Sequence, residues 1–480
     1  MWGDIRLGAA GRLLALMLGG LLALYLLPLI ISDTFHRDDI FRSIGGYTNW
    51  RSDGRVLADV FYALFTGSVN IAVDLHPLPL IIAAAFFTAI AVMVREAQGI
   101  PAFPLCIASF CIVANPFFLA NLFFRYDGPF MLLASATAIL PFALLGFAPV
   151  RLLLSAVLIT ASMALYQAAA GIFIAMAAIE LLHNVSRDVP PSIALRRLVA
   201  RVSALVLGYL LYSQVLTKVF PLHAYAASFG TLALVSGDWA EQLLINVQAS
   251  LRMTQHLAVW PMPFFLAPLL ITAAAGGGLT VFRARYRTIA FLAVVAVAVA
   301  ALLALLGVGI FSGRPMELAR GYVGVGGFLA ILVIMASYTG RASILGYVPM
   351  LLGLFSIGFA ASNAADADYR HYNRIASSIM DDLARYQVAA TSGIAIIGTA
   401  PRSRLADHAI AAFPIIEAVE QRIFDNNYDT GRFILIMAGA NPELEFRSPP
   451  ADLGPEVVTR PEYGLYVPHD GLPTVVFNIN

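Results

Sequence analysis

The sequence predicts an all-α polytopic membrane protein with about eleven transmembrane helices and a small C-terminal α/β domain outside the cytoplasm. Three observations support this fold class. Hydrophobic residues make up 60% of the 480 residues and charged residues only 12%, with a mean hydropathy of +0.80, which is unlike a soluble domain. Eleven apolar runs have about the length that the ~30 Å hydrocarbon core requires. After the last run the chain becomes polar.

The apolar runs alternate with loops that hold most of the charged and turn-forming residues. Arg6 and Arg12 precede the first run, as in a signal peptide, but no convincing small-residue cleavage site follows, so we expect a retained helix. The two runs that flank Tyr166 and Gln167 are short and could instead form one bent helix. The eleven runs lie near residues 13–31, 77–94, 101–122, 129–149, 152–166, 168–183, 200–220, 261–282, 288–311, 322–339 and 343–362.

Arginine placement favours two crossings at Tyr166 and Gln167. With a cytoplasmic N-terminus and two crossings, every basic loop faces the cytoplasm, as the positive-inside rule requires. A single bent helix would turn the two most basic loops outward. These basic loops contain Arg95, Arg151, Arg187, Arg196, Arg197, Arg201, Arg283, Arg285, Arg287 and Arg341. The segments then expected outside are 33–76, 125–129, 221–260, 312–320 and the tail after 363.

Two domains are expected: a transmembrane domain over 1–363 and a tail domain over 364–480. Within the first outer loop, 33–76, apolar residues recur at helical spacing from Val56 to Phe65, which predicts an amphipathic helix in the membrane interface with Arg55 and Asp59 on its wet side. The tail begins with a polar helix candidate. The apolar runs GIAIIGT, RFILIMAGA and PTVVFNI follow and suggest a small α/β domain.

Three aspartates are the catalytic candidates. Asp38 and Asp39 lie in the first outer loop, and Asp127 lies in a short outer turn between two apolar runs. Such a carboxylate can accept a proton from an acceptor hydroxyl. Surface ion pairs and a turn-forming aspartate explain the same residues about equally well. The three acids could also hold Mg²⁺ or Ca²⁺, although a phosphate leaving group with arginine partners requires neither ion.

Cations and polar side chains of the other outer segments complete the predicted site. Arginine suits phosphate because its guanidinium donates several hydrogen bonds in a plane, although for any single arginine a contact to lipid headgroups is the better explanation. The donor phosphate-binding candidates are Arg314, Arg320, Lys218, Arg252 and His223. The substrate-binding candidates are Arg125, Tyr126, Tyr166, Gln167, Trp50 and Arg55. Acids and cations together would match a sugar donor linked to a lipid phosphate. The net charge of +1 gives no reason to expect nucleic acid.

Several segments together resemble the serotype-converting O-antigen glucosyltransferases, which are similar to the GT-C class of polytopic glycosyltransferases. These segments are the DD pair, WRSDGRVLADVFYALF, the D-x-H-P-L-P motif at Asp74 to Pro79, NPFF followed by RYDGPFMLLA, and SMALYQAAAGIF. The resemblance implies transfer of a hexose, typically glucose, from a polyprenyl-phosphate carrier to a lipid-linked or polysaccharide acceptor at the periplasmic face of the bacterial inner membrane. It also implies an acidic base in the first outer loop, at Asp38 or Asp39, and a second acid at Asp127.

Two other classes of protein are alternatives. A transporter or flippase of lipid-linked glycans would carry charges inside its spans, whereas most of these runs are uncharged. A scaffold whose tail binds a partner would not need Asp38 or Asp39. The distribution of charge therefore favours a transferase with a site at the outer surface.

Overall fold

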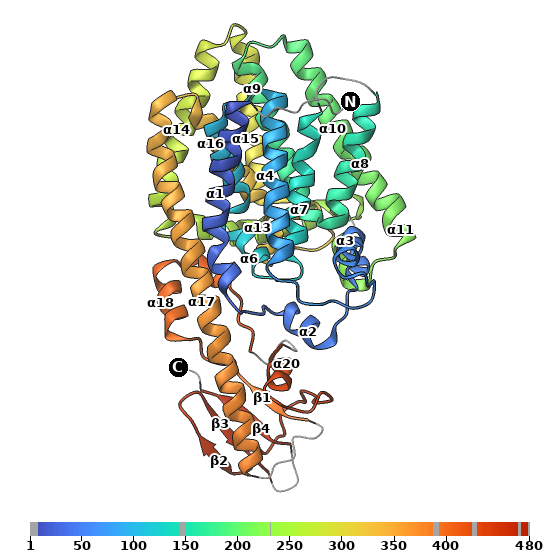
Figure 1. The fold of residues 1–480 in the computed structure, drawn as a ribbon, viewed down its shortest axis with the longest axis vertical. Helices are drawn as coiled ribbons and strands as arrows, with labels where there is room; N and C mark the ends of the chain where they lie inside the picture. The colour runs from blue at the N-terminus through green and yellow to red at the C-terminus, as the bar shows by residue number, and fades with distance from the viewer. Residues whose placement is uncertain are drawn as a thin grey trace.

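The structure is a computed structural model, which describes residues 8–144, 149–230, 232–386, 393–424, 430–468 and 472–478. A bundle of long helices forms one part of the molecule, and a small sheet with short helices forms the other (Figure 1). The long helix α17 (Ile344–Arg385) runs from the bundle into this second part. We call the end of the bundle from which α17 emerges the tail-side end.

Each of the eleven predicted runs contains a helix. Seven helices of the described residues are long and apolar enough to span a membrane, or eight if the pair α5 and α6, bent by 58°, forms one span. The structure thus supports a multi-pass protein, while the predicted crossings at α7, α8 and α16 rest on shorter helices. The helices are α1 (Ala9–Ile31), α4 (Leu78–Gln98), α5 (Ala102–Val113), α6 (Pro116–Leu122), α7 (Gly128–Ile139), α8 (Pro149–Leu165), α9 (Ala170–Ser186), α10 (Pro191–Leu211), α14 (Met262–Arg283), α15 (Arg287–Leu306), α16 (Gly324–Ser337) and α17.

The chain breaks into two separate helices at Tyr166, where the backbone is extended (φ −164°, ψ 114°). Gln167 Nε2, just before α9, donates a hydrogen bond to the backbone oxygen of Asp53 in the first outer loop. Near the other end of α9, the side chain of Glu180 accepts a hydrogen bond from Gln98 at the end of α4. The helix α9 therefore runs away from the first outer loop, whereas α8 ends beside it and packs along α7 and α10.

The first outer loop folds into the short helices α2 (Asp38–Gly45) and α3 (Val56–Thr66), joined by a 3₁₀ turn at Trp50–Asp53. The helix α3 confirms the predicted segment, but the expectation that Asp59 lies on a wet face is wrong. Its carboxylate is buried and accepts hydrogen bonds from the backbone N–H groups of Trp50 and Arg51. The exposed face instead carries Val60 and Leu64, as a face turned toward lipid would.

The tail contains a four-stranded sheet in the order β1-β4-β3-β2, with β1 (Ala395–Ile397) parallel to β4 (Thr474–Phe477). The strands β2 (Glu456–Thr459) and β3 (Tyr463–Tyr466) complete it by antiparallel pairing. The runs GIAIIGT and PTVVFNI thus supply β1 and β4. The run RFILIMAGA forms the helix α20 (Thr430–Met437) instead, because its buried residues 430, 431, 434 and 435 follow the helical period.

The tail packs against the bundle rather than hanging from it. The predicted domain boundary at 363 falls inside α17, which continues unbroken to Arg385. The helix α20 packs on α2, where the rings of Phe41 and Phe433 lie 4.6 Å apart. The helix α19 (Ile415–Val419) packs on α6 and inserts its apolar residues into the core of the bundle. The α2 helix, which carries Asp38 and Asp39, is thus held between bundle and tail.

Candidate active site

A buried carboxylate, that of Asp127, is the centre of a charged cluster at the tail-side end. It lies directly before α7 and is 4% exposed. Its two oxygens pair with Nη1 of Arg42 at 2.9 Å and with Nη1 of Arg55 at 3.0 Å, and the indole N–H of Trp50 donates to it as well. Burial acts to raise the pKa of Asp127, but the two guanidinium groups outweigh it and hold the pKa below its ordinary value.

The first outer loop supplies all three partners of Asp127. Trp50 is completely buried, and its ring lies against Tyr62 of α3 and Phe130 of α7. The guanidinium of Arg42 lies 4.3 Å from the centre of the Trp50 ring, a favourable cation–π arrangement. The buried ion pair of Arg42 with Asp127 and the packing of the Trp50 ring on Phe130 therefore fix the first outer loop on the bundle.

The Asp39 side chain is a buried acceptor for backbone groups. Its Oδ2 accepts a hydrogen bond from the N–H of Arg125 at 2.8 Å, and its Oδ1 accepts one from the N–H of Tyr126 at 3.3 Å. Burial and the neighbouring charge of Asp127 raise the pKa of Asp39 to about 8. A carboxyl group that is fully buried and protonated near neutral pH is poorly suited to take a proton from a substrate.

Replacing Asp39 with Ala is expected to destabilise the protein. The substitution leaves the buried N–H groups of Arg125 and Tyr126 without their acceptor, which costs about 1–3 kcal/mol for each unsatisfied group. The midpoint of thermal unfolding, measured in detergent, should therefore fall. Asp381→Ala, on the exposed side of α17, is the control and should leave the midpoint unchanged; a midpoint equal to that of the wild type in Asp39→Ala would contradict this role.

Asp38 differs from the other two acids because solvent reaches it. Its side chain is 27% exposed, and its Oδ2 lies 3.2 Å from Nη1 of Arg320, itself 24% exposed. Arg320 also faces the ring of Phe124 at 5.1 Å. An accessible carboxylate therefore lies beside an accessible guanidinium, directly next to the buried cluster of Asp127.

Tyr166 and Gln167 brace this site from the junction of α8 and α9. The hydroxyl of Tyr166 donates to the backbone oxygen of Arg320 at 2.7 Å, and its ring lies 5.0 Å from the guanidinium of Arg55. Gln167 Nε2 donates to the hydroxyl of Tyr212 at 2.7 Å as well as to the first outer loop. Both side chains are thus engaged with the protein around the Asp38–Arg320 pair.

The structure brings Asp38, Asp39, Asp127, Arg320, Arg55, Trp50, Tyr126, Tyr166 and Gln167 into one region. Arg125 borders it and clamps the loop, with Nη1 2.8 Å from Asp74 and Nη2 2.9 Å from Asp33. Arg314 instead lies over Tyr225 and Phe229 of α12 (Ala224–Gly230). His223 pairs with Asp53 at 2.7 Å. Lys218 and Arg252 are exposed on α11 (Thr217–Val219) and α13 (Trp239–Thr254).

The comparison with known families is decisive for the identity of the chain. The family model described as "Glucosyl transferase GtrII" matches residues 27–337. The chain belongs to this family. The match confirms the resemblance to serotype-converting glucosyltransferases and makes the chain a membrane glycosyltransferase. The matched residues include both Asp38 and Arg320 of the charged cluster, whereas the tail lies beyond the matched residues.

A relative from Salmonella phage P22, described as "Uncharacterized 55.3 kDa protein in gtrB 5'region", is 24% identical over 426 residues. The similarity covers 85% of this chain and 86% of the relative. No solved structure shows a significant match.

The acids that the structure of this GtrII protein describes are not arranged as a metal site. Among the described residues, no group of three or more His, Cys, Asp or Glu side chains could hold a metal ion. Both oxygens of Asp127 and both oxygens of Asp39 face N–H donors, so these two carboxylates are poor ligands for the Mg²⁺ or Ca²⁺ considered from the sequence.

One important residue was not selected from the sequence: Arg42. It lies four residues after Asp38, in a segment with many arginines, and periodicity does not distinguish it from a solvated side chain. The structure shows it 5% exposed beside Asp127. A positional signal was nonetheless present, because an arginine three or four residues after two aspartates in a helix lies on the same face as one of them.

Proposed function

We propose that the protein transfers a glucosyl group from a polyprenyl-phosphate carrier to a surface glycan such as O-antigen, with Asp38 as the general base. The accessible Asp38–Arg320 pair is the observation that carries the proposal. Membership of a glucosyl transferase family supports the transfer of glucose, and the helical bundle suits a donor that is itself a lipid. The same membership favours a transferase over the transporter considered from the sequence.

The proposed reaction is a direct displacement at the anomeric carbon of the sugar. The acceptor hydroxyl oxygen forms a bond to this carbon while the bond to the phosphate oxygen breaks. The proton of the hydroxyl passes to the Asp38 carboxylate, and the polyprenyl phosphate leaves with the bonding electron pair. Negative charge grows on the phosphate during this step, and the guanidinium of Arg320 stabilises it electrostatically.

The other acids have supporting roles in this proposal. The oxygens of Asp39 hold the backbone of the 125–127 turn, and those of Asp127 hold Arg42 and Arg55. Arg42 and Arg55 in turn add positive charge close to the departing phosphate. The roles of Lys218, Arg252, Arg314 and His223 in donor binding stay predictions.

The proposal places the tail-side end on the periplasmic face of the inner membrane, with a cytoplasmic N-terminus. Arginine-rich loops at the opposite end of the bundle support this orientation through the positive-inside rule. On this face the protein has no access to cytoplasmic nucleotide sugars, which is why the donor would have to be carried by a lipid.

Reconstitution of the purified chain with defined donors tests the proposed activity. Proteoliposomes that contain a lipid-linked glycan acceptor should incorporate labelled glucose from polyprenyl-phosphate glucose. They should not incorporate it from UDP-glucose. Transfer from UDP-glucose alone, or no transfer from the lipid-linked donor across a panel of acceptors, would overturn the proposal.

Replacing Arg320 with Gln is expected to lower the transfer rate by about a hundredfold, the typical effect of removing one donor to a developing negative charge. Arg314→Gln serves as the comparison variant, since Arg314 is also an outer arginine but its guanidinium lies over Phe229 of α12. The rates of both variants are measured at saturating donor. A larger loss in Arg314→Gln than in Arg320→Gln would assign the phosphate to Arg314 instead.

A further inference from the structure

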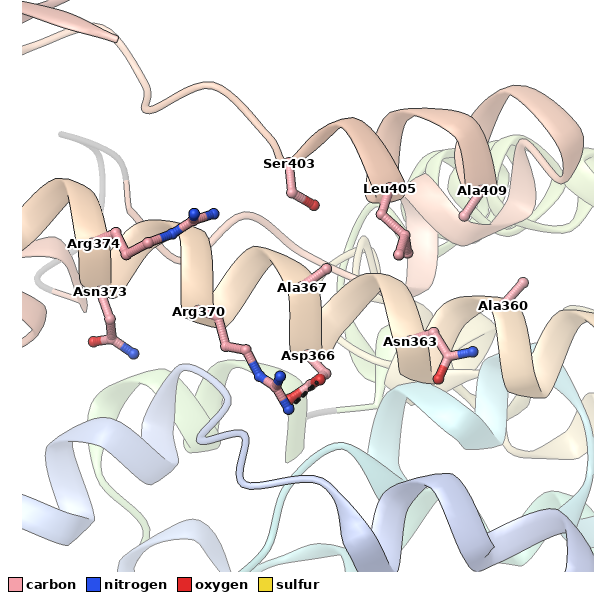
Figure 2. A pocket seen from close by; sticks show the side chains of 10 residues that line it. All are labelled: Ala360, Asn363, Asp366, Ala367, Arg370, Asn373, Arg374, Ser403, Leu405 and Ala409. Carbon is pink, nitrogen blue, oxygen red and sulfur yellow. Dashed lines mark ion pairs between the residues drawn. The ribbon is translucent and has the colours of Figure 1, made fainter. Parts of the chain in front are cut away.

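A groove lies between α17 and α18 (Arg404–Ala412), at the point where α17 leaves the bundle (Figure 2). Its volume is about 980 Å³. The residues from α17 are spaced by three or four positions and therefore share one helix face. They are Ala360, Asn363, Asp366, Ala367, Arg370, Asn373 and Arg374, opposite Ser403, Leu405 and Ala409 of the α18 segment.

The groove changes from apolar to cationic along its length. At the end nearest the bundle, Ala360 and Ala409 face it, where the apolar run of α17 ends at 362. Arg374 lies fourteen residues further along α17, or about 21 Å at 1.5 Å per residue. This stretch of α17 starts at the predicted edge of the hydrocarbon. It is longer than the headgroup region of a bilayer, which is only about 5–8 Å thick on each side.

Both arginines reach back toward the membrane. Helical side chains tilt toward the N-terminus of their helix, and the N-terminal part of α17 lies in the bundle. Arg370 follows this rule and pairs with Asp366 at 2.9 Å. Figure 2 shows Arg374 extended from α17 toward Ser403. The structure gives Arg374 no ion pair or hydrogen bond within the described ranges, so its guanidinium is available to a ligand.

Hydrogen-bond donors also line the groove. The side chains of Asn363 and Asn373 lie on the same face of α17. The Ser403 oxygen accepts the N–H of Ala406 as a helix cap, which leaves its hydroxyl hydrogen to donate. Two arginines against one aspartate give the lining a net charge of +1. This composition suits an anion with several acceptor oxygens.

We propose that this groove binds the phosphate group of a membrane lipid, with the lipid chain along the apolar end of α17 and the phosphate beside Arg370 and Arg374. The shape supports a lipid over a free anion, because an amphipathic groove continuous with the edge of the bilayer matches an amphipathic ligand. A polyprenyl phosphate and an ordinary phospholipid share this chemistry. The site is separate from the Asp38–Arg320 pair, and lipid binding there does not depend on the proposed glucosyl transfer.

Photo-crosslinking of the full-length protein in proteoliposomes tests the site directly. The probe is a polyprenyl phosphate with a diazirine near its phosphate, and the modified peptides are identified by mass spectrometry. Peptides that cover 360–374 and 403–409 should be labelled. Double substitution Arg370→Gln and Arg374→Gln should reduce this labelling about tenfold or more, as expected for charge-assisted hydrogen bonds. Arg385→Gln, further along the same helix, is the control and should label like the wild type.

Competition identifies the source of the phosphate. Unlabelled polyprenyl phosphate that competes better than phosphatidylglycerol indicates a carrier lipid, and equal competition indicates general phospholipid; both results support the proposal. Inorganic phosphate that competes as well as either lipid would overturn it. An absence of labelling from these peptides would also overturn the proposal. So would undiminished labelling of a double variant whose thermal midpoint matches that of the wild type. Labelling requires no turnover, so the labelling result can be interpreted even if the protein does not transfer glucose.

Discussion

Asp38→Asn is expected to reduce the rate of glucosyl transfer by about a hundredfold to ten-thousandfold, the usual contribution of a general base. Asn has nearly the same shape as Asp but cannot accept the proton of the acceptor hydroxyl. Since Asp38 is partly exposed and pairs with a partly exposed arginine, the fold should survive the change. The transfer rate from polyprenyl-phosphate glucose is measured in proteoliposomes, together with the thermal midpoint of the variant.

Asp74→Asn is the matched control for this experiment. Asp74 has a similar exposure, 33%, and also pairs with an arginine of the outer region, Arg125, at 2.8 Å. Its carboxylate does not contact Arg320 in the structure, so we expect its loss to change the rate less than tenfold. If both variants lost activity equally, the base would not be Asp38. A fully active Asp38→Asn would exclude it outright.

Asp127→Asn is expected to lower the free energy of unfolding by about 3–5 kcal/mol, because it leaves Arg42 and Arg55 with uncompensated charges in a buried pocket. Activity should also fall, since the first outer loop would lose its anchor on the bundle. Thermal unfolding in detergent measures the first effect. The loss of stability distinguishes this variant from Asp38→Asn, which should lose activity and keep its stability.

The pair of the exposed Asp33 with Arg125 is the control for Asp127. Asp33 is 95% exposed and lies 2.9 Å from its arginine, and such pairs contribute about 0–1 kcal/mol. Asp33→Asn should therefore unfold close to the wild type. Equal midpoints for Asp127→Asn and Asp33→Asn would show that the buried pairs do not hold the loop in place.

Much of the fold follows from the sequence because hydropathy and periodicity act locally. The apolar runs, the helix after Arg55 and the strands β1 and β4 were predicted where the structure has them. The break at Tyr166 was identified from arginine placement. The sequence could not separate α20 from a strand, since a short apolar run fits either structure. The continuity of α17 through 363 was also missed, because a change from apolar to polar residues indicates a change of solvent, not the end of a helix.

Part of the candidate site was predicted as a group, but Lys218, Arg252 and Arg314 lie elsewhere. The internal roles of the grouped residues were not predicted. Asp38 and Asp39 are neighbours in sequence, and only the tertiary structure shows that one is exposed and the other accepts buried N–H groups. Asp59 was expected in water because a charged residue usually is, yet it satisfies the backbone of the turn at Trp50. The groove beside Arg374 was not expected either, since α18 is brought to α17 by the fold of the tail.

A structure of the protein with a bound polyprenyl-phosphate glucose analogue, in which a phosphonate replaces the cleavable phosphate oxygen, tests the central claim most directly. The account predicts that the anomeric carbon of glucose lies beside Asp38 at the tail-side end, within reach of an acceptor hydroxyl held by that carboxylate. It also predicts that the phosphonate contacts Arg320. A sugar bound away from Asp38, with the phosphonate on Arg314 or at the opposite end of the bundle, would contradict it.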